Sequence, residues 1–178
     1  MMLIQKLIEN ALKDMKNLVM DVENDKVNEF IETILNSNRV FTIGVGFSKF
    51  AAESCASQLI RNGFDSYLIG NVSTPAVEKE DCVIGFSRSG ESEYIVNTFE
   101  IARKKIDPKL MSITPDSNSS LGKLSDLNIP IKKFDSTNEN LSKNIFPDLF
   151  ELTSLLFVDA VLLNIIKRTM YNQTVSFE

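Results

Sequence analysis

Apolar residues recur along this chain first at helical spacing and then in short β-branched runs. Residues 3–20 and 25–36 carry apolar side chains three or four positions apart, which predicts two N-terminal helices within residues 1–37. After Asn38 the apolar residues no longer recur at helical spacing. Val40-Phe41-Thr42-Ile43 is a compact run closed by a glycine, as expected for the first strand of a buried parallel sheet.

The rest of the chain alternates between further strands and helices. This alternation has the spacing of right-handed βαβ units and predicts an α/β fold, a three-layer doubly wound sheet of five parallel strands. The remaining strands are expected at 66–69, 81–86, 109–114 and 127–131, and the helices at 48–62, at 93–105 and, as a short one, near Leu121.

Two segments near the C-terminus depart from that alternation. Residues 132–145 are polar and predict either a loop or a lid over a site. Residues 146–170 predict one long helix that is apolar nearly all round, which must lie in the core or in a subunit interface. The sequence shows no internal repeat and no sign of a second domain, so we expect residues 1–178 to form a single domain.

Charge and cysteine content indicate which partners and which cellular compartment are compatible with this sequence. The net charge is −5 and the basic residues are scattered, which argues against a nucleic acid or an anionic membrane as partner. No signal peptide is recognised, and we expect no apolar run that approaches the roughly 20 residues of a membrane span. Cys55 and Cys82 lie among apolar residues without metal-ligand spacing, so we expect reduced core cysteines in a cytoplasmic protein.

The chain contains no histidine, which restricts the chemistry available to it. Histidine triads, histidine metal sites and imidazole acid–base catalysis are excluded, so an enzyme with this sequence would use carboxylates, Lys, Tyr, Cys or water. Gly44-Val45-Gly46 resembles half of a dinucleotide-binding fingerprint, but Lys49 stands at the position of its third glycine. We therefore expect no nicotinamide cofactor.

The most informative segment is a cluster of small hydroxyl residues directly after the third predicted strand. Ser87, Ser89 and Ser92 surround Gly90 and precede a predicted helix. Glycine lets the backbone approach an anion, the hydroxyls supply hydrogen-bond donors, and the free N–H groups of the helix face the ligand. This pattern favours a phosphate-binding turn. The alternative is an ordinary serine-rich βα turn in which Ser92 is the helix N-cap.

Glu151 is the second candidate, because it lies between Phe150 and Leu152 on the long apolar helix. A carboxylate there is costly unless it is paired or functional, and burial would raise its pKa toward that of a proton-abstracting base. Alternatively, it occupies a solvated strip in the first helical turn, where acids suit the helix dipole. Thr114, at the end of the fourth predicted strand, could border a pocket. Arg61 could meet a substrate or be a surface charge.

Taken in order, these motifs resemble the SIS (sugar isomerase) domain family, and within it the 6-phospho-3-hexuloisomerases. The resemblance covers residues 1–170 and rests on Gly44-Val45-Gly46-Phe47-Ser48, Thr74-Pro75-Ala76, Ser87-Arg88-Ser89-Gly90-Glu91-Ser92, Ile113-Thr114, Ser120 to Asp126 and Leu149-Phe150-Glu151-Leu152.

The resemblance implies a flavodoxin-like strand order and a homotetramer. It also implies interconversion of D-arabino-3-hexulose 6-phosphate and fructose 6-phosphate through an enediol, without cofactor or metal. Glu151 would move the proton, assisted by Arg61. The residues expected around the phosphorylated sugar are Gly46, Ser48, Ser87, Ser89, Gly90, Glu91, Ser92 and Thr114.

Three positions depart from the pattern of these isomerases. They usually carry Arg where this chain has Phe47 and Gln58, and His where it has Arg61. An arginine stays protonated, so Arg61 could polarise a carbonyl but not act as a base. Two other functions therefore remain open: a non-catalytic phosphosugar sensor, and a scaffold whose apolar helix serves only in assembly.

Overall fold

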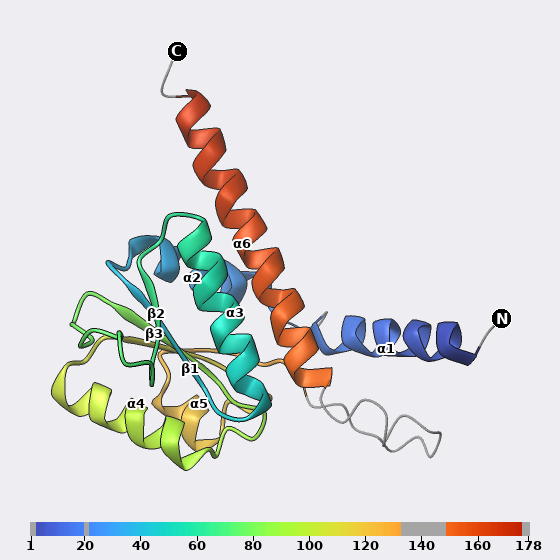
Figure 1. The fold of residues 1–178 in the computed structure, drawn as a ribbon, viewed down its shortest axis with the longest axis horizontal. Helices are drawn as coiled ribbons and strands as arrows, with labels where there is room; N and C mark the ends of the chain where they lie inside the picture. Colours follow the sequence, from blue (N-terminus) through green and yellow to red (C-terminus); the bar gives the residue numbers. More distant parts are fainter. Residues whose placement is uncertain (1–2, 20–21, 133–148, 176–178) are drawn as a thin grey trace.

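The computed structural model describes residues 3–19, 22–132 and 149–175. Its centre is a sheet of five parallel strands in the order β2-β1-β3-β4-β5 (Figure 1). This confirms the predicted α/β fold and its flavodoxin-like strand order. The strands are β1 (Val40–Gly44), β2 (Ser66–Leu68), β3 (Cys82–Phe86), β4 (Lys109–Ile113) and β5 (Leu127–Ile129).

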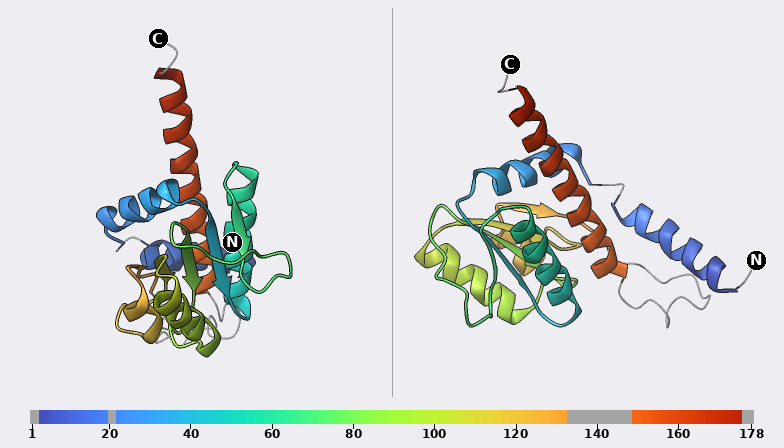
Figure 2. Two further views of the ribbon diagram at one scale, coloured as in Figure 1. Left: turned by 90° about the vertical axis from the view of Figure 1, so that its left-hand side faces the viewer. Right: turned by 45° about the horizontal axis from the view of Figure 1, so that its top comes forward.

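Helices cover both faces of the sheet, as Figures 1 and 2 show. One face packs against α2 (Asn24–Asn36), α3 (Phe47–Arg61) and α6 (Leu149–Val175), and the other against α4 (Glu93–Lys105) and α5 (Ser120–Leu124). α1 (Leu3–Val19) contacts α6 and extends away from the sheet. The three layers follow from strands that are buried on both sides.

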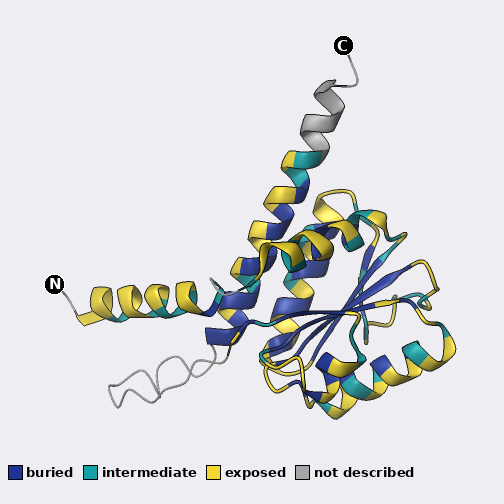
Figure 3. Ribbon diagram, turned by 180° about the vertical axis from the view of Figure 1, so that it is seen from behind, coloured by how far each residue is buried: buried dark blue, intermediate teal, exposed yellow. Residues whose placement is uncertain are grey.

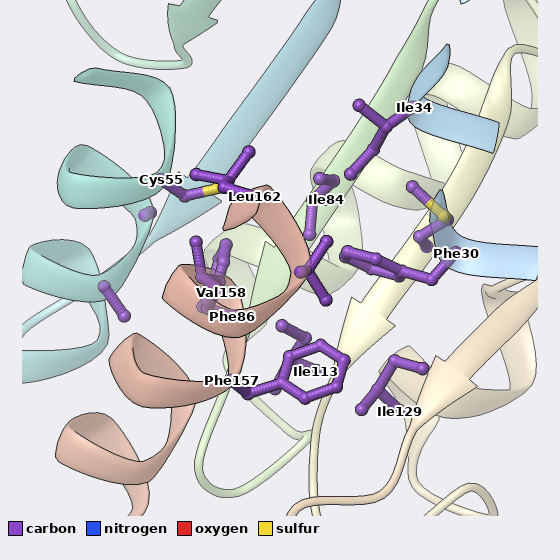
Figure 4. Packing of buried hydrophobic residues seen from close by; sticks show 14 of the residues in the cluster. Phe30, Ile34, Cys55, Ile84, Phe86, Ile113, Ile129, Phe157, Val158 and Leu162 are labelled. Atoms are coloured by element: carbon purple, nitrogen blue, oxygen red, sulfur yellow. The ribbon is translucent and has the colours of Figure 1, made fainter. Parts of the chain in front are cut away.

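The apolar core consists of two clusters, one on each face of the sheet. Successive side chains of a strand point to opposite faces and so belong to different clusters. In β1, Val40 joins the cluster under α2, α3 and α6, whereas Phe41 and Ile43 join the cluster under α4. In the larger cluster, the rings of Phe30 and Phe157 meet edge to face with centroids 5.8 Å apart (Figure 4). That contact joins α2 to α6 and fixes the long helix over the sheet.

Both cysteines are buried and free, in agreement with the sequence-based expectation. Cys55 lies on α3 in the larger core (Figure 4), and Cys82 begins β3. Burial in this apolar environment raises the pKa of Cys82 to about 12 and raises that of Cys55 as well. Both thiols are therefore protonated at neutral pH and behave as small apolar side chains.

The long helix α6 is only partly a core helix. Phe157, Val158 and Val161 are buried, whereas the side chains that face away from the core are half exposed (Figure 3). Of the predicted span 146–170, residues 146–148 lie outside the described residues, and the helix extends to Val175. The predicted loop or lid at 132–145 also lies outside them, apart from Lys132.

By length and composition alone, the segment Leu149–Arg168 of α6 could cross a membrane. The sequence-based statement that no apolar run approaches that length was therefore wrong. Just over half of this segment, 56%, is buried inside the protein, and α6 packs against both α1 and α3. A core helix passes the same test of length and composition, so the segment is weak evidence for a membrane span.

Candidate active site

The strand order reverses at the centre of the sheet, between β1 and β3. The chain leaves β1 for β2 on one side and leaves β3 for β4 on the other. Gly44, the last residue of β1, pairs in register with Phe86, the last residue of β3, so the two strands end level with each other. Ligands of doubly wound sheets bind in the crevice outside the strand ends at such a reversal.

A glycine turn, residues 44–48, carries the chain from β1 into α3. A Cβ atom on Gly44 would lie 2.5 Å from the carbonyl oxygen of Ser48, so only glycine allows the helix to start this close to the strand. Gly46 has a φ of 58°, in the left-handed region that favours glycine. The turn therefore places Ser48 in the first turn of α3, directly above the strand ends.

Ser48 meets Glu151 there. Its Oγ donates a hydrogen bond of 3.0 Å to Oε1 of Glu151, and the two side chains are only 6% and 7% exposed. Glu151 stands in the first turn of α6, which runs beside α3. The interpretation of Glu151 as a solvated surface residue is thereby wrong, because its carboxylate is buried and bound to a residue of the candidate site.

The serine loop, residues 87–92, is held by its own hydroxyl groups. The amide of Gly90 donates to Ser87 Oγ at 3.0 Å, and the amide of Glu91 donates to Ser89 Oγ at 3.1 Å. A serine oxygen that accepts a backbone hydrogen bond keeps its own proton for donation. Ser92 occupies the N-cap position of α4 without a side-chain capping bond, so its hydroxyl is not used by the helix.

The glycine turn, the serine loop and Glu151 enclose one cavity of about 260 Å³. Its walls combine hydroxyl groups, one carboxylate, one guanidinium group and apolar side chains. A phosphate placed there would face the N-termini of α3 and α4, whose unsatisfied N–H groups favour anions. The cavity is lined by Val45, Gly46, Phe47, Ser48, Phe86, Ser87, Arg88, Ser89, Ser92 and Glu151.

The structure thus brings together the predicted residues Gly46, Ser48, Glu151 and the three serines of the loop. Sequence reasoning did not single out Val45 or Phe86 as lining residues. Val45 lies between the two glycines of the turn and Phe86 ends β3, so their positions beside recognised motifs were an available signal. Phe47, known from the sequence as a departure from the family pattern, lines the cavity and is 64% exposed.

Three predicted residues, two of them in the serine loop itself, do not line the cavity. Gly90 packs against Ser119, where a side chain at position 90 would overlap the serine. Glu91 turns away and accepts two hydrogen bonds from Ser120. Thr114 is fully buried, and its Oγ1 has no hydrogen-bond partner within the described residues.

Arg61 is far from Glu151 within the chain. It ends α3, 13 residues after Ser48, which corresponds to about 20 Å along a helix. There it lines a separate open hollow of about 590 Å³ between α3 and α6. In this hollow, Gln58 Nε2 donates to Oδ1 of Asp159 at 2.6 Å. Arg61 therefore does not reach the Glu151 cavity of its own chain.

The described residues contain no group of three or more Cys, Asp or Glu side chains that could hold a metal ion. The cavity itself offers one carboxylate, that of Glu151, among hydroxyl and apolar groups. Divalent cations of the Mg²⁺ type need several oxygen ligands, usually including more than one carboxylate or a substrate phosphate. The donor set of this cavity suits a polar organic anion better than a protein-held metal ion.

A parallel sheet of this order, with a serine loop at its reversal point, makes this a doubly wound α/β protein with a candidate anion site at the strand ends. Residues 33–158 match the model of the SIS domain, and the chain belongs to that family.

Among its relatives is the 3-hexulose-6-phosphate isomerase of Bacillus subtilis, 33% identical over 164 residues, which are 90% of this chain and 88% of the relative. A transcriptional regulator of the helix-turn-helix type from Clostridium perfringens is 24% identical, and the match covers 88% of this chain but 57% of the regulator.

Two solved structures have the same fold and are each 28% identical to this chain. A Methanococcus jannaschii protein, for which its structure led to an inferred function of 3-hexulose-6-phosphate isomerase, superposes with a TM-score of 0.76 over 93% of this chain and 90% of its own. An Escherichia coli protein, solved in complex with a ligand, gives a TM-score of 0.78 over 94% and 90%.

Proposed function

We propose that this chain is a phosphosugar isomerase that interconverts D-arabino-3-hexulose 6-phosphate and fructose 6-phosphate. One observation carries the proposal: a buried carboxylate, Glu151, is held by Ser48 inside the cavity that the serine loop borders. The site therefore combines a proton acceptor with an anion-binding loop. The isomerase relatives support the choice of substrate, since two of them match 90% and 83% of this chain.

The reaction moves a carbonyl group from C3 to C2. In the proposed step, the Glu151 carboxylate removes the proton on C2, the electron pair forms a C2=C3 double bond, and O3 takes the negative charge. A proton then passes from O2 to O3. The carbonyl forms at C2 as the carboxyl group of Glu151 returns its proton to C3. The sugar and one carboxylate group are sufficient for these steps, and the cavity contains one carboxylate, that of Glu151.

The serine loop and two helix N-termini would hold the phosphate. Ser87, Ser89 and Ser92 line the cavity and can each donate a hydroxyl proton. Arg88 lines it as well and adds a permanent positive charge. Phosphate bound in this way would fix the sugar chain relative to Glu151, and such positioning lowers the barrier to proton transfer.

Arg61 enters the proposal only with a second copy of the chain. Within one chain it lies at the far end of α3 from Ser48, about 20 Å away along the helix. We therefore propose that its guanidinium group polarises the sugar carbonyl or stabilises the enediolate in the cavity of a neighbouring subunit. Its permanent charge suits that role and excludes a role as base.

The exposed face of α6 supports such an assembly. Leu152, Leu156 and Leu163 follow one another along the helix and are 45%, 50% and 59% exposed. Large apolar side chains that gather on one helix face commonly mark a protein interface. We propose a homo-oligomer through this face, with the tetramer as its expected state, and the cytoplasm as its location.

The test is a coupled assay in which fructose 6-phosphate is measured as it forms from 3-hexulose 6-phosphate. Glu151→Gln removes the proton acceptor while keeping the shape, and we expect turnover to fall by about 10³-fold with binding of fructose 6-phosphate retained. Glu53→Gln on α3, an exposed carboxylate, is the matched control and should retain full activity. Undiminished turnover in Glu151→Gln would contradict the proposed role of Glu151.

A phosphosugar sensor is the second candidate, favoured by the regulator relative and by the departures at Phe47, Gln58 and Arg61. The same cavity would then bind the sugar phosphate without converting it. Binding of fructose 6-phosphate by the wild-type chain, with no turnover of any sugar phosphate tested, would support this candidate over the isomerase.

A further inference from the structure

We infer that Glu91 is a positioning residue, which locks the serine loop to α5 so that its hydroxyl and amide groups are held ready for phosphate. The inference deepens the proposed function and rests on it for the identity of the ligand. It also revises the expectation that Glu91 touches the phosphosugar.

The carboxylate of Glu91 is directed at α5. Oε1 of Glu91 accepts from the amide of Ser120 at 2.9 Å, and Oε2 accepts from the Ser120 hydroxyl at 2.6 Å. Both oxygens are thus engaged on α5, and Glu91 does not line the cavity. These two hydrogen bonds favour the charged form and lower the pKa of Glu91. A carboxylate facing the phosphate itself would instead repel it.

The backbone beside Glu91 is hydrogen-bonded to α5 as well. The amide of Leu121 donates to the carbonyl of Gly90 at 2.9 Å, so two consecutive residues of the loop are bonded to two consecutive residues of α5. Gly90 has a φ of 70° and lies against Ser119, where a Cβ atom would overlap the serine side chain. The loop therefore packs against the N-cap of α5 and is also hydrogen-bonded to the helix.

The orientation of two ligand-facing serines depends on the same loop residues, Gly90 and Glu91. The amides of Gly90 and Glu91 hold Ser87 Oγ and Ser89 Oγ inside the loop. If residues 90 and 91 detach from α5, those two serines lose their fixed orientation. Detachment would therefore weaken phosphate binding although no group that contacts phosphate has been removed.

The test compares Glu91→Ala with Glu93→Ala, because the two carboxylates are exposed and two positions apart. Glu93 lies in the first turn of α4, and its removal takes one negative charge from the vicinity of the phosphate. If Glu91 acts only through its charge, both variants should bind inorganic phosphate equally well or more tightly than the wild type. If it locks the loop, Glu91→Ala should bind about tenfold more weakly, while Glu93→Ala should not.

Ser120→Ala provides the reciprocal variant, since it keeps Glu91 and removes one of its donors. Isothermal titration with inorganic phosphate should show weaker binding, by a smaller factor than in Glu91→Ala. The effects of the double variant should be less than additive, because both changes break the same contact. In turnover, Glu91→Ala should raise KM and leave kcat nearly unchanged, since Glu151 is not affected.

Two outcomes would overturn the inference. One is phosphate binding in Glu91→Ala that is unchanged or tighter, as in Glu93→Ala. The other is loss of sugar phosphate binding in Glu91→Ala with inorganic phosphate binding unchanged and Ser120→Ala silent, because Glu91 would then contact the sugar.

Hydrogen exchange separates this inference from the proposed function. The amide of Leu121 should exchange faster in Glu91→Ala than in Glu93→Ala, whether or not any ligand binds. Equal exchange rates would contradict the positioning role. Phosphate binding without isomerase turnover would instead contradict the isomerase and leave the role of Glu91 supported.

Discussion

Ser48 and Glu151 are joined by a hydrogen bond although 103 positions separate them in the chain. The bond links the first turn of α3 to the first turn of α6, and both residues line the cavity that the serine loop borders. The contact thus couples the glycine turn, which accommodates the backbone, to the carboxylate that would perform the chemistry.

Loss of this hydrogen bond should reduce catalysis without abolishing it. In Ser48→Ala, Glu151 remains in place but one of its oxygens is no longer oriented, so we expect kcat to fall by about tenfold. Glu151→Gln should cost far more. Steady-state assays on both variants measure the two effects, with Ser73→Ala, an exposed loop serine, as control. A Ser48→Ala enzyme as impaired as Glu151→Gln would assign the serine a direct part in proton transfer.

Ser92→Ala should separate ligand binding from helix stability. An N-cap serine that bonds the helix typically stabilises it by about 1 kcal/mol, but Ser92 makes no side-chain capping bond. We therefore expect the free energy of unfolding in urea to change by less than about 0.5 kcal/mol, and the Kd for fructose 6-phosphate to rise by about tenfold. A large loss of stability with unchanged binding would instead support the ordinary capping role.

Gly90 and Gly63 form a matched pair for the packing of the serine loop. Both have positive φ, 70° and 86°, but a Cβ atom on Gly90 would overlap Ser119, while one on Gly63 would meet nothing within 4 Å. Gly63→Ala should cost about 1 kcal/mol for the left-handed backbone alone. Gly90→Ala should cost about 1–3 kcal/mol more and weaken phosphate binding. Urea unfolding measures the difference, and equal losses would argue against tight packing of the loop on α5.

The contribution of Arg61 can be tested by mixing two inactive chains. If Arg61 acts in the cavity of a neighbouring subunit, Arg61→Ala and Glu151→Gln are each inactive alone but complement each other when they share an oligomer. Co-expression with different tags should restore about a quarter of wild-type activity, because about half of the pairs are mixed and each mixed pair has one intact site.

Activity that stays at background in purified mixed oligomers would contradict a site shared between subunits. An Arg61→Ala chain that is fully active alone would instead exclude Arg61 from the reaction. Lys104→Ala in place of Arg61→Ala serves as the control, since this exposed residue of α4 should leave its own chain active.

Much of the fold could be predicted from local patterns in the sequence. The alternation of apolar runs and helical segments predicted the five parallel strands, because strands buried on both faces need continuous apolar residues. The serine loop was also recognisable from its small hydroxyl residues around Gly90, although the sequence left open whether they bind phosphate or cap the helix. The length of α3 already separated Ser48 from Arg61 by its regular rise per residue.

Tertiary structure decided what those local patterns could not. On sequence grounds, Glu151 could have been a solvated acid or a buried base, and only the packing of α6 beside α3 buried it against Ser48. Glu91, next to the serines in sequence, faces Ser120 instead of the cavity because α5 folds back against the loop. The direction of a side chain depends on which element packs beside it, and that contact arises from residues far away in the chain.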